Sequence, residues 1–340
     1  MKKLLLFTLL IATVACMASE KAYKAMFQKE TNILVKIEAP TWDKFSKENK
    51  LEEMFSFLKT QNDLSEVSAS LQKMVEEKLK DNKVQNVYVT AALLKDDILG
   101  ALDAKSAKGV FLVVELEAPL TIDLVMEIVA EAGKKDEVGC TRADIGEFQA
   151  IQVKAKNDEF VITLVDAGKT VVVGKPEEIK AYLERYKSGS VVDVPAKLAE
   201  VAAVSSSSLV IAFAMPDGLD KYLGDEADKV RENNPMNATF MDTGAKLQGL
   251  NIALNPSGNA LEVKLGFLMN TPEDAIQLKA FIFEGMLKPM LGMMMNNQGQ
   301  PYAFVQKLVF GCENRCATAT TTISLEEIAG FMRTMAMMRP

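Results

Sequence analysis

The chain has 340 residues, of which 49% are hydrophobic and 25% are charged, so it is long enough to bury one large core or two smaller ones. Its formal net charge of -7, with acids and bases interspersed, argues against nucleic acid or an anionic membrane surface as a partner. It contains no histidine, which excludes Ser-His-Asp and Cys-His catalytic sites and every metal site that needs an imidazole ligand.

The N-terminal 18 residues have the three zones of a secretion signal. Lys2 and Lys3 precede an apolar run over residues 4–15, and small residues lead up to Ala18. This run is shorter than the roughly 20 residues that a membrane-spanning helix needs, and no later run reaches that length. We therefore expect residues 1–18 to be a signal peptide, no transmembrane segment, and an exported protein in the periplasm or the outer envelope.

Two processing routes are open at this signal. Cleavage after Ala18 releases a soluble protein that starts at Ser19. Alternatively, residues 13–16 resemble a lipobox, in which Cys16 is lipidated and becomes the new N-terminus, although Thr13 stands where a leucine is usual. Membrane attachment is expected only if Cys16 is lipidated.

Strands that end in proline recur along the chain. The prolines are Pro40, Pro119 and Pro216, and a helix is expected after each because proline fits the first turn of a helix. Pro176 and Pro272 mark a second recurrence, and their spacing (272 − 176 = 96) nearly equals that of the other pair (216 − 119 = 97). We interpret this as duplication of a strand-Pro-helix unit, with chance recurrence as the alternative.

The first half is predicted to be an N-terminal α+β domain over residues 19–190, with candidate units at 30–100 and 108–188. The second unit contains four short stretches of strand residues separated by turn formers, which predict a meander closed by a helix from Pro176. The predicted strands are 138–144, 148–155, 160–165 and 170–173.

A serine-rich linker over 191–208 is predicted to separate this domain from a C-terminal α+β domain over 209–340. Alternating apolar residues on both sides of 255–259 predict a hairpin, and Ser324 with Glu327 predicts a capping box on the last helix. The expected class is α+β: two or three related strand-Pro-helix units with mostly antiparallel sheets, packed into two adjoining domains.

Three cysteines follow the signal. Cys312 and Cys316 flank a short turn, and export implies an oxidising compartment, so they are a candidate disulfide. Redox activity is the less favoured interpretation, because such sites normally have two intervening residues at a helix N-terminus. Cys140 is then unpaired and is expected to be buried.

Methionine is concentrated in two C-terminal helical segments, and helical spacing predicts that most of it lies in buried stripes. The stripes are Ile282, Met286, Met290 and Met293, and Leu325, Ile328, Met332 and Met335. Four methionines lie partly outside the stripes and are candidates for lining a groove that binds an apolar ligand: Met294, Met295, Met337 and Met338. Coordination of Cu(I) by thioethers is a further alternative.

The sequence contains no nucleotide-binding or calcium-binding motif. Three adjacent acidic pairs, at 177–178, 273–274 and 326–327, fall in first turns of predicted helices, where the helix dipole accounts for them. We expect no cofactor. The leading hypothesis is a non-catalytic envelope protein with a binding or structural role, whose partner is an envelope protein or an apolar ligand. One alternative is a binder of hydrophobic peptides or lipids that uses the Met-rich helices. The other is a hydrolase that works with Asp and Glu alone.

Overall fold

The computed structural model of this chain describes residues 20–51, 77–79, 82–94, 108–133, 138–155, 158–189, 193–205, 207–293 and 302–337. They belong to two compact units. Unit 1 comprises Met1–Thr31, Val35–Ala92 and Lys108–Pro195, and unit 2 comprises Asn32–Leu34, Leu93–Ala107 and Ala196–Pro340.

The chain passes from unit 1 to unit 2 inside the predicted linker, but this segment is partly helical. Helix α10 (Ala196–Ala202) lies within it and belongs to unit 2. Leu198 and Val201 of α10 are completely buried, so hydrophobic packing fixes this helix within the predicted linker.

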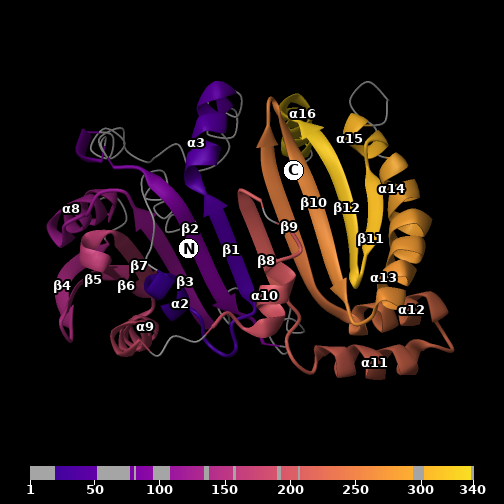
Figure 1. The fold of residues 1–340 in the computed structure, drawn as a ribbon, viewed down its shortest axis with the longest axis horizontal. Helices are drawn as coiled ribbons and strands as arrows, with labels where there is room; N and C mark the ends of the chain where they lie inside the picture. Colours follow the sequence, from indigo (N-terminus) through magenta and orange to yellow (C-terminus); the bar gives the residue numbers. More distant parts are fainter. Residues whose placement is uncertain are drawn as a thin grey trace. The chain divides into compact units, whose positions relative to one another are not determined.

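Unit 1 is built on an antiparallel sheet (Figure 1). Its strands, in hydrogen-bonded order, are β2 (Val84–Ala92), β3 (Lys108–Leu116), β7 (Thr170–Gly174), β6 (Asp158–Val165), β5 (Phe148–Ala155) and β4 (Gly139–Ile145). The predicted meander is confirmed, because β4 to β7 follow one another both in the chain and in the sheet. Strand β1 (Ile33–Glu38) is divided between the two units.

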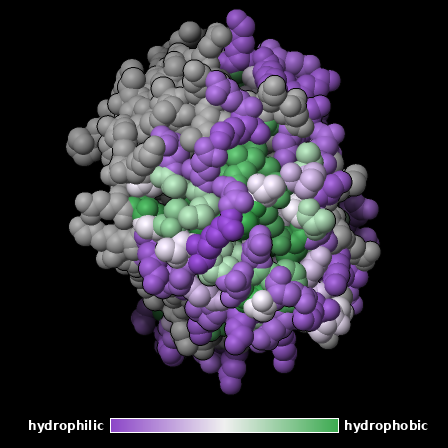
Figure 2. Space-filling view, turned by 90° about the vertical axis from the view of Figure 1, so that its left-hand side faces the viewer, coloured by the Kyte–Doolittle hydropathy of each residue, from purple (hydrophilic) through white to green (hydrophobic). Residues whose placement is uncertain are grey.

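Helices cover the sheet of unit 1. Helix α8 (Ile122–Gly133) contacts β4 and β5, whereas α9 (Pro176–Ser188) contacts β3, β6 and β7. Partly buried apolar residues pack against the core that includes α8, among them Leu124, Val138, Cys140 and Phe160. Figure 2 faces this side and shows apolar residues in its middle with hydrophilic residues around them.

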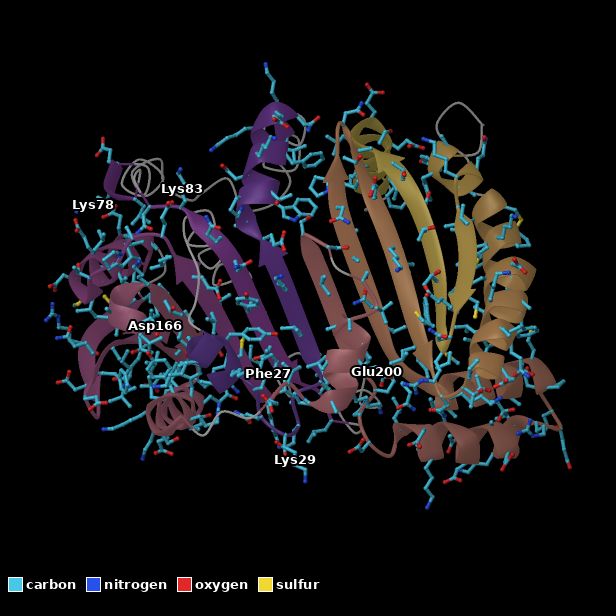
Figure 3. The ribbon with its side chains drawn as sticks, viewed as in Figure 1. Phe27, Lys29, Lys78, Lys83, Asp166 and Glu200 are labelled. Atoms are coloured by element: carbon cyan, nitrogen blue, oxygen red, sulfur yellow. The ribbon has the colours of Figure 1, made fainter. Side chains whose placement is uncertain are left out.

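The first described helix, α2 (Glu20–Ala25), is held against α9. Tyr182 Oη donates a hydrogen bond to the carbonyl of Ala22 at 3.1 Å, and Arg185 Nε donates to the carbonyl of Ala25 at 2.9 Å. Phe27, which follows α2 (Figure 3), is completely buried. The residues that come directly after the predicted signal peptide are therefore part of the core of unit 1.

The strands of unit 2 are also paired antiparallel (Figure 1). The strands, in hydrogen-bonded order, are β8 (Leu209–Ala214), β9 (Leu247–Ser257), β10 (Ala260–Met269), β12 (Cys316–Ser324) and β11 (Val309–Glu313). Its helices besides α10 are α11 (Leu219–Val230), α12 (Pro235–Ala245), α13 (Pro272–Leu278), α14 (Lys288–Gly292), α15 (Ala303–Gln306) and α16 (Leu325–Met337). The π-helical segment η3 (Lys279–Leu287) joins α13 directly to α14.

The predicted place of proline in the first turn of a helix is confirmed for three of the five prolines, whereas Pro119 and Pro216 lie three residues before α8 and α11 begin. Pro40 lies in the first turn of α3 (Ala39–Glu48), and Pro176 and Pro272 begin α9 and α13. The amide of Glu327 donates to Ser324 Oγ at 3.2 Å, and the amide of Ser324 donates to Glu327 Oε2 at 3.1 Å, which is the predicted capping box.

The antiparallel α+β class is confirmed, whereas duplication remains a prediction. The strand-helix junctions recur at β3–α8 and β8–α11, but unit 1 has four strands before its next helix and unit 2 has two after α12. No helix in the described ranges is long and apolar enough to cross a membrane.

The close approach of α10 to β9 depends on Gly249. A Cβ at this position would lie 2.3 Å from a methyl of Val201 and 2.6 Å from the carbonyl oxygen of Phe213. We predict that Gly249→Ala lowers the free energy of unfolding by about 1–3 kcal/mol, because α10 must move away from the sheet. Urea unfolding measures this, with Gly224→Ala as the control. Gly224 lies inside α11 with open space around it, so its replacement should be neutral or stabilising; equal effects of both changes would contradict the packing described.

Candidate functional site

Strands β8, β9 and β10 of unit 2 present two unlike faces. One face is closed by α10, and its residues on β8 and β9 are buried: Val210, Ala212, Ala214, Gly249, Asn251 and Ala253. The Asn251 side chain donates to the carbonyl of Val201 at 3.1 Å, and Lys264 Nζ donates to the carbonyl of Val204 at 3.1 Å. Polar bonds and close glycine packing therefore fix α10 to this face.

The opposite face carries nine apolar side chains in register across the three strands. Antiparallel pairing aligns Leu209, Leu254 and Val263 in one row, Ile211, Ile252 and Leu265 in the next, and Phe213, Leu250 and Phe267 in the third. None of the nine is fully buried, and Ile252 at the centre is 37% exposed. We call these nine residues the apolar sheet face.

A helix borders this face on one side. Phe283 of η3 is buried and packs on Phe267, with 5.1 Å between ring centroids. Leu265 and Phe267 also pack against the buried cluster that includes Leu278 of α13. The β10 side of the apolar sheet face is therefore partly covered by α13 and η3. None of its nine residues is ionisable, so the face is suited to a hydrocarbon surface.

Six further apolar side chains are exposed on or beside the helices of unit 2. They are Met236 and Phe240 of α12, Ile276 of α13, Phe281 of η3, Met290 of α14, and Met293. They are exposed to between 36% and 72%, and they make up six of the eleven large hydrophobic residues that are exposed in the described part of the chain. Phe240 of α12 packs on Phe281 of η3, with ring centroids 6.2 Å apart. We call these six residues the helix surface.

The sequence predicted a buried stripe through Ile282, Met286, Met290 and Met293. This prediction is wrong at Met290 and Met293, which are 56% and 72% exposed. Residues 279–287 form a π-helix, whose hydrogen bonds run from i to i+5, so each turn takes up more residues than an α-turn. Pro289 lies just beyond and has no amide to donate to the carbonyl of Gly285 four residues earlier. The stripe spacing assumes uninterrupted α-geometry and loses register across η3.

The side chains of the four methionines predicted to line a groove all lie outside the described part of the structure. Met294, Met295 and Met338 lie outside the described residues, and Met337 ends α16 with its side chain outside them. In the second predicted stripe, Leu325 is buried and Ile328 and Met332 are partly buried. The predicted groove at these four methionines therefore stays a prediction.

The predicted Cys312–Cys316 disulfide is absent from this structure, in which both thiols are free. Cys312 lies opposite Ala317, and Cys316 lies opposite Glu313. Opposed residues share a face and neighbouring residues alternate, so the two cysteines point to opposite faces of the hairpin. Burial raises the pKa of the Cys316 thiol. Cys140 is partly buried rather than fully buried, and Cys16 lies outside the described residues.

Two acids of unit 1, Glu115 and Asp166, are held by hydrogen bonds from other residues of the same unit. Glu115 is 2% exposed and accepts a hydrogen bond from Asn86 Nδ2 at 2.7 Å. Burial, together with Glu115, raises the pKa of Tyr88 well above its usual value. Asp166 (Figure 3) accepts bonds from Tyr186 Oη at 2.7 Å and Thr170 Oγ1 at 3.0 Å, and burial and this bond raise the pKa of Tyr186 to about 12. These contacts are those of a structural network.

Ionisable groups in unit 2 pair at its surface. Glu200 of α10 (Figure 3) forms an ion pair with Arg315 in the turn between β11 and β12. Within the described ranges, no three Cys, Asp or Glu side chains are close enough together to hold a metal ion. The apolar sheet face and the helix surface thus keep apolar side chains that the packing of unit 2 does not fully bury.

Sequence reasoning missed the apolar sheet face, although part of its signal was visible. The alternation over residues 250–267 indicated a hairpin with one apolar side. The run Leu209–Ala214 is apolar on both sides, so it does not show which side a helix covers. That choice depends on α10, which was not predicted.

Comparisons with known proteins leave the family open. No family model matches the chain, and no curated protein does. Crystal forms III, I and IV of TP0453 align with TM-scores of 0.45, 0.43 and 0.44 at 10%, 9% and 11% sequence identity. The alignments cover 91%, 93% and 91% of this chain and 97%, 98% and 95% of the TP0453 chains.

Proposed function

We propose that this protein is exported to the cell envelope and binds there, without catalysis, an aliphatic ligand such as the acyl chain of a lipid, on the apolar sheet face of unit 2. The observation that carries the proposal is the set of nine partly exposed apolar side chains aligned across β8, β9 and β10. Native surfaces rarely leave such a contiguous apolar area without a partner.

The energetics favour a hydrocarbon chain. Each buried methylene of a ligand contributes about 0.8 kcal/mol, so a chain with about ten buried methylenes gains roughly 8 kcal/mol before the costs of association. The protein side chains add to this as their remaining exposed area is covered. Affinity should therefore depend on the length of the chain.

The backbone of the sheet argues against an extended peptide as the ligand. Strand β9 is paired on both sides, with β8 and β10, and β10 is paired with β9 and β12. Their amide and carbonyl groups are already used, so a peptide lying across them would have its own polar backbone groups desolvated without partners. An acyl chain has no such groups.

Binding of a fluorescent fatty acid tests the proposal, with decanoate and palmitate as unlabelled competitors. We expect the longer palmitate to compete more strongly, and Ile252→Asp to weaken binding at least about tenfold, because the ligand would desolvate a carboxylate. Ile252 is already 37% exposed, so the fold should tolerate the change.

The matched control for this experiment is Val309→Asp. Val309 is 62% exposed and pairs with Thr320, which places it on the opposite face of the same sheet. It should bind like the unchanged protein. If the two variants bind equally, or if the unchanged protein binds neither competitor, the proposed site is wrong.

Export makes a separate prediction. The residues that follow the signal contribute to the core of unit 1 through Ala22, Ala25, Met26 and Phe27, which are completely buried. Expressed in a bacterium with its signal, the protein should be recovered from the envelope fraction with an intact mass that starts at Ser19 or at lipidated Cys16. Cys16→Ser distinguishes the two, because it removes only the lipid-bearing form. A cytoplasmic protein that retains Met1–Ala18 would contradict export.

A further inference from the structure

The helix surface defined above is distinct from the apolar sheet face and has a different form. Segment η3 is apolar on nearly every side: Phe283 is buried against the sheet, whereas Phe281 is 41% exposed. A helix that is hydrophobic all round is normally buried. Met290 and Met293 extend the exposed side beyond η3, and Met236 and Phe240 extend it on to α12. This surface therefore requires a partner of its own.

Charged side chains around the helix surface carry both signs and pair with one another. Lys279 pairs with Glu284 at 2.8 Å, Lys246 with Asp274 at 2.8 Å, and Arg231 with Asp242 at 2.8 Å. An apolar centre rich in Met and Phe, bordered by polar residues, is the composition of a protein–protein interface. Three cations here, Arg231, Lys246 and Lys279, each lie beside an acid, so the surface presents charges of both signs to a second copy.

We propose that the helix surface is the interface of a two-fold homodimer of this protein. In such a dimer the same surface meets itself, so each partner must supply both the apolar centre and charges of both signs, as this surface does. Six side chains of this size, exposed to between 36% and 72%, supply roughly 600 Å² of the about 800 Å² that each partner buries in a typical interface. The charged border supplies the rest.

A lipid bilayer is the competing occupant, and the charges argue against it. Helices that lie in the membrane interface combine an apolar side with a polar side rich in Lys and Arg. Here the segment from α13 to α14 has Lys279 and Lys288 against Glu273, Asp274 and Glu284. This acidic excess, in a chain with a net charge of -7, favours a protein surface that carries both signs.

Sedimentation equilibrium of the full mature protein over a range of concentrations tests the proposal. We expect a monomer–dimer equilibrium in which Met290→Ser combined with Met293→Ser raises the dimer dissociation constant at least tenfold. Both side chains are more than half exposed, so the variant should keep its fold, which circular dichroism checks. Val309→Ser, an exposed residue outside the helix surface, should leave the dissociation constant unchanged.

Three outcomes would overturn the dimer. They are a monomer at every concentration, a dimer that the methionine variant leaves intact, and a monomer that binds phosphatidylcholine vesicles through Met290 and Met293. The last result would assign the surface to a bilayer. Ile252→Asp, which changes the apolar sheet face, should still dimerise, so failure of the proposed ligand site and failure of the dimer are distinguishable.

Discussion

The docking of α10 on one face of strands β8–β10 determines the rest of unit 2. Gly249 and Gly266 leave room for Val201 and Val204, and the Asn251 side chain bonds to the α10 backbone. One face of the sheet is thereby closed. Because side chains alternate along a strand, closing one face fixes which nine apolar residues lie on the other. In the described part of the chain, α13 and η3 cover the β10 side of this second face, and the exposure that its residues retain is the physical basis of the proposed ligand site.

The two acids described in unit 1 serve the packing of that unit. The chain has no histidine, and the buried acid Glu115 is engaged with Asn86. Asp166 is likewise held by Tyr186 and Thr170. Unit 1 thus uses its buried polar groups to fix α2, α9 and the sheet, whereas unit 2 presents apolar surface. The proposed roles follow this division: unit 1 provides a stable body directly after the signal, and unit 2 provides the contacts with partners.

Much of the fold was predictable because its signals are local. The capping box at Ser324 and Glu327, the helix starts at Pro40, Pro176 and Pro272, and the meander of unit 1 all depend on residues close together in the chain. The exposed residues were harder to predict for a physical reason. The exposure of Met290 depends on the geometry of η3, which ends three residues upstream, and the exposure of Ile252 depends on which face α10 occupies. Neither effect can be predicted from the spacing of apolar residues in the sequence.

The most direct test of the central claim is methyl NMR of the mature protein, labelled at Ile, Leu and Val and titrated with palmitate. The account predicts that the largest shift changes occur at Ile211, Ile252 and Leu265, which form the middle row of the apolar sheet face. Ile276 on the helix surface and Val309 on the opposite sheet face should not respond. Changes confined to Ile276 and Val309, or no changes in a titration that reaches saturating palmitate, would contradict ligand binding on this face.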